Sequence, residues 1–148
     1  MEIDSVDKQI LSALAADARL SYRDIAKRLG LSHASVSARV KKLEEGGVIK
    51  GYTTVVDPDA EGLYPLCLRI SARPGYELAE IGRRVSEFPE VHVVMRVSGE
   101  CELLALTLTG DRQAALDLLA KINRIEGIEK AESHVVLESL KLSGFRLK

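Results

Sequence analysis

The segment from residue 32 to residue 45 carries side chains that could contact DNA. Apolar residues recur there at helical spacing and give a predicted helix one buried face, made by Val36, Val40 and Leu43. The opposite face begins with short side chains, which let a helix approach the base edges of a major groove. The residues that we expect nearest the bases are Ser35, Ser37, Ala38, His33 and Lys41.

Basic side chains around the same face are expected to contact phosphates, which position a protein on DNA without reading its sequence. These are Arg23, Arg39, Lys42 and Lys50. Between residues 19 and 42 the chain holds seven basic residues and one acidic residue, Asp24, which predicts a local basic face. Two alternatives stay open: a solvated helix whose charges only maintain solubility, and a surface position without a base contact for His33.

Two shorter predicted helices would position this one. Asp4 can cap a first helix, and Ser21 with Asp24 resembles a capping box that opens a second. Gly30 follows the second helix in a turn too short for another element, and Ser32, which we include among the DNA-facing residues, caps the third helix. Two short helices joined by a glycine-containing turn form a helix-turn-helix.

The segment after the third predicted helix should form a wing. Residues 48–56 are rich in β-branched side chains and broken by a glycine, which indicates a small hairpin with Lys50 at its tip. Residues 57–62 have turn chemistry throughout. We therefore predict two domains, residues 1–60 and residues 61–148.

The second half predicts a βαββαβ order. Strands are expected at 66–72, 91–97, 101–109 and 128–140, and helices at 77–88 and 112–125. This is the ferredoxin-like arrangement, an antiparallel sheet with both helices on one face, and it makes the whole chain an α+β protein. Because several strands are apolar on both faces, we expect the uncovered face to pack against a second copy of the chain.

Composition narrows the class of protein. Of 148 residues, 46% are hydrophobic and 29% charged, as in soluble globular proteins, and the net charge of −1 means that DNA affinity would need a doubled basic face. No apolar run could span a bilayer and the first residues lack a secretory pattern, so we expect a cytoplasmic protein without membrane contact. Cys67 and Cys101 have no metal-ligand spacing and read as buried thiols. We expect no cofactor and no catalytic motif.

The order of these parts resembles the Lrp/AsnC family of prokaryotic transcription regulators, also called feast/famine regulators. The resemblance rests on residues 4–11, 18–21, 25–32 (IAKRLGLS), 36–44, 47–52 and 97–102 (VSGECE). It implies a winged helix-turn-helix that binds double-stranded DNA, followed by a βαββαβ domain that senses a small molecule. It also implies homodimers formed through the sheets, often assembled into octamers, with amino acids or related molecules bound between the sensing domains.

The same resemblance suggests an effector site. Where relatives carry Gly-Asp-Tyr-Asp, this chain reads Gly99-Glu100-Cys101-Glu102, and Ser133 stands where relatives carry Thr. The residues that the resemblance carries over are Ser98, Gly99, Glu100, Glu102 and Ser133. The changed acids and the lost aromatic mean that the effector cannot be copied from a relative. The alternative is a polar turn without a ligand, and His92, Arg96 and His134 are interpreted as sheet or interface residues.

Two other functions share this architecture. Siroheme decarboxylases resemble it, but the Arg- and His-bearing stretch of those enzymes is not matched at 93–99. An interaction protein with a non-functional helix-turn-helix is the third possibility, and the basic stretch from residue 19 to residue 42 argues against it. The sequence therefore favours a regulator without enzymatic activity.

Overall fold

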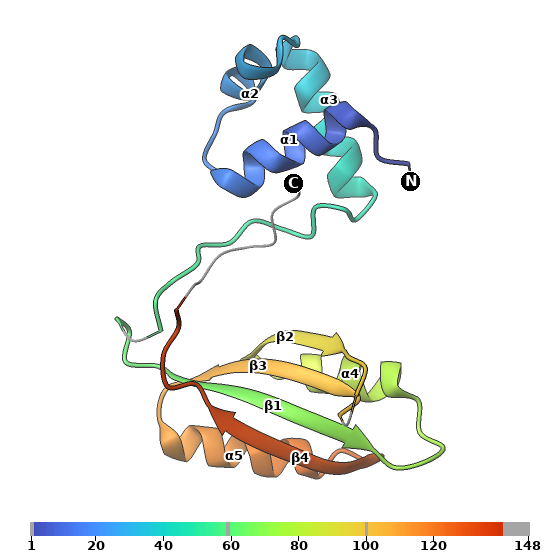
Figure 1. The fold of residues 1–148 in the computed structure, drawn as a ribbon, viewed down its shortest axis with the longest axis vertical. Coiled ribbons are helices and arrows are strands. Elements are labelled where there is room, and N and C mark those ends of the chain that lie inside the picture. Colours follow the sequence, from blue (N-terminus) through green and yellow to red (C-terminus); the bar gives the residue numbers. More distant parts are fainter. Residues whose placement is uncertain (1, 59, 100, 141–148) are drawn as a thin grey trace. The chain divides into compact units, whose positions relative to one another are not determined.

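The computed structural model describes residues 2–58, 60–99 and 101–140. The chain divides into two compact units, with the division between Val55 and Val56. The first unit is helical and the second is built on a β-sheet, as Figure 1 shows. The α+β class predicted from the sequence is therefore confirmed.

The first unit contains α1 (Ser5–Ala16), α2 (Tyr22–Leu29) and α3 (His33–Glu45). Each helix begins where the sequence places a polar cap. The carboxylate of Asp4 accepts the N–H of Asp7, and the hydroxyls of Ser21 and Ser32 accept the N–H groups of Asp24 and Ser35. The three helices bury one apolar cluster: Ile10, Leu14, Ile25, Ala26, Val36 and Val40.

The turn between α2 and α3 has the geometry of a helix-turn-helix. Gly30 ends α2 in the left-handed region at φ 66°, where glycine is favoured, and the N–H of Leu31 donates to the carbonyl of Ala26 at 2.9 Å. Ser32 then opens α3 in an extended conformation. The turn fixes where α3 starts, and the helix-turn-helix prediction is confirmed.

The small hairpin expected at 48–56 is not formed, and no strand is present between residues 48 and 57. The N–H groups of Val48 and Ile49 both donate to the carbonyl of Leu43, so they complete the end of α3 and cannot pair with a strand. The hydroxyl of Tyr52 donates to Glu44 at 2.9 Å, which holds the following segment against the same helix end. Lys50 therefore lies in this connecting segment and not at a hairpin tip.

The second unit is a four-stranded antiparallel sheet with two helices, in the predicted βαββαβ order. Its strands are arranged β2-β3-β1-β4. The last strand is shorter than expected, since it ends at residue 135. The elements are β1 (Tyr64–Ala72), α4 (Leu78–Ser86), β2 (Val91–Arg96), β3 (Leu103–Thr109), α5 (Arg112–Asn123) and β4 (Ile128–Val135).

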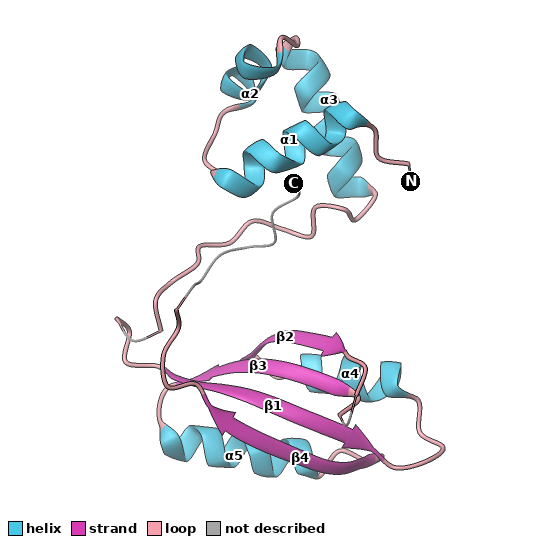
Figure 2. Cartoon of the chain, in the orientation of Figure 1, coloured by secondary structure: helices cyan, strands magenta, loops and turns pink. Residues whose placement is uncertain are grey.

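Both helices lie on one face of this sheet (Figure 2). Alternate residues of β1 and β3, such as Leu68 and Ala105, are fully buried beneath them. The neighbours of Ala105 along β3 point to the other face, where Leu104 is half-buried and Leu106 is 39% exposed. The apolar second face that the sequence predicts is present, and no described element of the second unit covers it.

Cys67 and Cys101 are free thiols, but each is only half-buried and not buried as the sequence suggested; partial burial raises the pKa of Cys67. Within the described ranges, no three His, Cys, Asp or Glu side chains are grouped as metal ligands. None of the described helices combines the length and apolar character needed to cross a bilayer.

The turn before α3 gives a first prediction. Gly30→Ala forces a side chain into the left-handed region, and we expect it to lower the free energy of unfolding by about 1 kcal/mol. Urea unfolding followed by circular dichroism measures this change. The matched control is Gly110→Ala, which meets no atom within 4 Å and needs no left-handed backbone. Equal effects of the two substitutions would show that Gly30 is not constrained by the turn.

Candidate DNA-binding face and effector residues

Helix α3 presents the predicted DNA-reading residues together on its unburied side. His33, Ala38 and Lys41 are exposed, while Ser35 and Ser37 are partly exposed. On the opposite side, the apolar residues Val36, Val40 and Leu43 are at most 1% exposed. Their burial fixes the rotation of the helix about its axis. The exposed side is therefore short-chained at its start and basic toward its end, as major-groove contact requires.

His33 and Tyr22 link the two helices of the helix-turn-helix. Their ring centroids lie 6.3 Å apart with the planes tilted by 45°, a separation within the range of aromatic pairs. Tyr22 is the first residue of α2 and His33 the first residue of α3. The imidazole is thus held at the N-terminal end of α3, where the reading face begins.

Arg39, which the sequence suggested as a contact for a DNA phosphate, is paired with two acidic residues of the same chain. Its Nη1 lies 2.7 Å from Asp4 Oδ2 and 2.7 Å from Asp7 Oδ1, and Asp7 is only 5% exposed. Hydrogen bonds to Asp4 and then to Asp7 raise the pKa of Arg39. The N–H of Asp7 and then the guanidinium lower the pKa of Asp4. The guanidinium therefore joins α3 to α1, and its expected contact with a phosphate stays a prediction.

The other predicted phosphate contacts stay accessible. Arg23, Lys42 and Lys50 are exposed, and within residues 2–58 none of them forms an ion pair or a hydrogen bond that would hold its charge. Lys41 lies 3.8 Å from Glu45, but both groups are largely exposed, so this contact is weak. The cationic groups available to DNA are thus separate from the one that holds the helices together.

The predicted effector turn lies between β2 and β3. Ser98 and Gly99 are exposed, and Gly99 has φ +122°, while Glu100 lies outside the described residues. Glu102 is tied to the neighbouring strand, because its Oε2 accepts the N–H of Ala72 at 2.7 Å. One carboxylate oxygen therefore fastens the turn to the end of β1.

Ser133 lies elsewhere in the sheet. It belongs to β4 and lies opposite Leu68 of β1. Together with Tyr64 and Leu116, it lines a hollow of about 170 Å³ beside α5. Glu102 and Ser133 are on opposite sides of β1 in the strand order. One copy of the chain therefore does not bring all the predicted effector residues to one place.

Sequence reasoning missed the pairing of Asp7 with Arg39. The two residues are 32 positions apart, and Asp7 also has a sufficient local role as the partner of Asp4 in the helix cap. A buried acidic residue on an apolar helix face was the available signal, because such a charge needs a partner.

Comparison with known proteins settles the family. A model described as winged helix-turn-helix DNA-binding matches residues 3–50, and a model described as Lrp/AsnC ligand binding domain matches residues 66–144. The chain belongs to the Lrp/AsnC family. It is a DNA-binding transcriptional regulator of the Lrp/AsnC type.

Relatives cover nearly all of this Lrp/AsnC chain. The HTH-type transcriptional regulator LrpA of Pyrococcus horikoshii is 36% identical over 94% of the chain and 99% of its own length. The crystal structure of the Mycobacterium tuberculosis leucine response regulatory protein has a TM-score of 0.87 at 27% identity, covering 98% of this chain and 99% of that one. A feast or famine regulatory protein from M. tuberculosis, complexed with L-methionine, has a TM-score of 0.80 at 28% identity, covering 95% and 96%.

Arg39 and Lys42 of this Lrp/AsnC regulator should respond differently to substitution. Arg39→Ala leaves Asp7 buried without its cation, so we expect a lower midpoint of urea unfolding and an unchanged slope of log Kd against log salt. Lys42→Ala should leave stability unchanged and reduce that slope by about 0.9, the value of one released phosphate contact. Equal slope losses for both variants would return Arg39 to the DNA-contacting set.

The cap of α1 in this Lrp/AsnC regulator should contribute to acid sensitivity. The pKa of Asp4 lies below its ordinary 3.8 in the fold, so its stabilising effect is complete above that value and is lost as the pH falls through the lowered pKa. Asp4→Asn keeps a capping side chain but removes the charge. We expect this variant to be less stable than the native chain near neutral pH and equally stable well below pH 3.8, in urea unfolding across pH. A constant difference at every pH would contradict this.

Proposed function

We propose that this Lrp/AsnC regulator binds a pseudo-palindromic DNA site as a dimer. The two α3 helices enter major grooves about one helical turn apart, or at multiples of that distance. The observation that carries the proposal is the exposed side of α3, which has short side chains at its start and accessible basic residues. These basic residues are distinct from Arg39, which is paired with Asp4 and Asp7. The relatives bear the names of regulators, which favours regulation over catalysis.

The dimer is proposed to form through the uncovered sheet face. Leu104 and Leu106 of β3 lie on that face beside Val93 and Met95 of β2, which are half-buried. An apolar surface of this kind is stabilised when a second copy removes it from water. Pairing also doubles the basic face, which the net charge of −1 requires for DNA affinity.

We further propose that an amino acid or a related small molecule binds between sensing domains of different copies. The effector residues are Ser98, Gly99, Glu100, Glu102 and Ser133. Two observations support this: a relative has been crystallised with L-methionine, and the turn and Ser133 lie on opposite sides of β1. A site completed by a second copy accounts for that separation. Occupancy would shift dimers and larger assemblies such as octamers between states that differ in DNA affinity.

Selection of bound sequences from a DNA library at one fixed salt concentration tests this function. The selection is repeated with and without a panel of amino acids that includes L-methionine. We expect enriched two-fold sites, salt-sensitive binding, and a change in affinity of about fivefold or more with one member of the panel. Absence of salt-sensitive binding at micromolar protein would overturn the DNA-binding proposal.

The effector proposal has its own control. Glu102→Gln should reduce the response to the active amino acid while binding of DNA without it stays unchanged. The matched variant is Glu129→Gln, an exposed residue of β4 outside the proposed site, and it should respond like the native chain. Equal responses of both variants would remove Glu102 from the effector site.

A further inference from the structure

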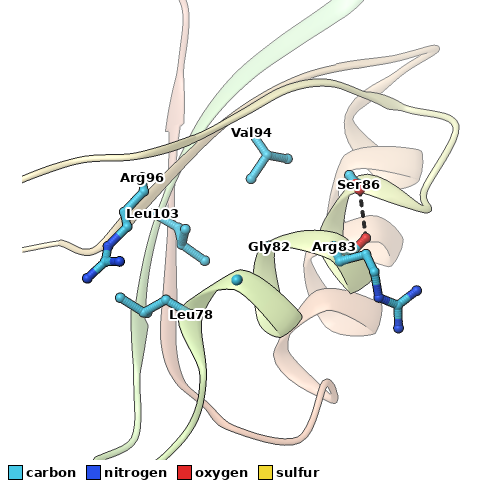
Figure 3. Close-up of a pocket in the computed structure, with 8 residues that line it drawn as sticks. Leu78, Gly82, Arg83, Ser86, Val94, Arg96 and Leu103 are labelled. Atoms are coloured by element: carbon cyan, nitrogen blue, oxygen red, sulfur yellow. Dashed lines mark hydrogen bonds between the residues drawn. The ribbon is translucent and has the colours of Figure 1, made fainter. Parts of the chain in front are cut away.

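A second hollow lies between α4 and the edge strand β2, apart from Ser133 and the exposed residues of the turn. Its volume is about 370 Å³, within the range of about 300–1,000 Å³ typical of small-molecule sites. Figure 3 shows Leu78 of α4, Val94 of β2 and Leu103 of β3 around it. Its walls are therefore mainly aliphatic.

One cation at this hollow has no side-chain partner among the described residues. Arg83 lines it too, but its guanidinium is paired with Glu80 and Glu87 on the same helix. Arg96 is exposed at the end of β2, and its guanidinium forms no hydrogen bond or ion pair with any side chain that the structure describes. An unpaired guanidinium beside an apolar wall is suited to a carboxylate, which it can bind through two N–H groups.

Gly82 opens the floor of the hollow. It lies inside α4, where glycine weakens a helix, and it does not have a left-handed backbone. A Cβ there would stand 3.7 Å from both Val94 and Leu103, which is ordinary contact, so packing does not demand glycine either. The consequence of the missing side chain is space between α4 and β2.

We propose that this hollow binds a small aliphatic monocarboxylate. Its carboxylate pairs with Arg96, and its hydrocarbon chain lies over Gly82 against Leu78, Val94 and Leu103. Arg96 and Leu103 are register partners on the two strands that flank the 97–102 turn. This site goes beyond the proposed function, because it needs neither DNA nor a second copy of the chain.

Titration of the full chain with 4-methylpentanoate, followed by backbone amide NMR and by calorimetry, tests the proposal. We expect the amide signals of Gly82, Val94 and Leu103 to shift. The neutral 4-methylpentanamide should bind about tenfold more weakly, since it lacks the charge that pairs with Arg96.

Two variants separate the charge from the space. Arg96→Met should weaken binding of 4-methylpentanoate about tenfold, whereas Arg84→Met, which removes an arginine of α4 beside a different hollow, should leave it unchanged. Gly82→Ala should weaken binding about fivefold by filling the floor, while thermal unfolding moves to higher temperature because alanine favours the helix.

Absence of shifts at Gly82, Val94 and Leu103, or equal binding of acid and amide, would overturn the proposal. So would native affinity in both Arg96→Met and Gly82→Ala. These results are independent of DNA selection: loss of this site would leave the proposed DNA and amino-acid responses intact, and loss of those responses would leave 4-methylpentanoate binding intact.

Discussion

The sheet of the second unit is apolar on both faces but is covered by helices on only one. This constraint determines how the protein can work. Burial of Leu68 and Ala105 beneath α4 and α5 stabilises one copy, whereas Leu106, on the opposite face, is 39% exposed and is not covered by the described elements of its own unit. In the proposed dimer a second copy would supply it and would bring a second α3, which would offset the weak net charge.

Within the first unit, one arginine stabilises the packing of the helices, and other basic side chains remain accessible for DNA. Arg39 joins α3 to α1 through Asp4 and the buried Asp7, so the orientation of the recognition helix is fixed before DNA is met. Arg23, Lys42 and Lys50 remain exposed and can pair with phosphates. Preorganisation of this kind lowers the conformational cost of binding.

The sequence predicted those features that depend on neighbours along the chain. The caps at Asp4, Ser21 and Ser32, the turn at Gly30 and the βαββαβ order all follow from local chemistry and periodicity. The hairpin prediction was wrong because the N–H groups of Val48 and Ile49 donate to the carbonyl of Leu43 at the end of α3. The β-branched composition of this segment does not reveal these hydrogen bonds. The pairing of Arg39 with Asp7 and the hollow over Gly82 were missed because the residues that form them are distant in sequence.

The central claim, that two sheet-paired copies read one DNA site, is tested most directly by hydroxyl-radical footprinting of a selected site. The native chain should protect two major-groove segments whose centres are about 10 base pairs apart, or a multiple of that. Leu106→Glu, which charges the uncovered sheet face while leaving the α3 side chains unchanged, should abolish the paired protection together with the dimer seen by sedimentation. A single protected segment in the native chain, or an unchanged pair in Leu106→Glu, would contradict the account.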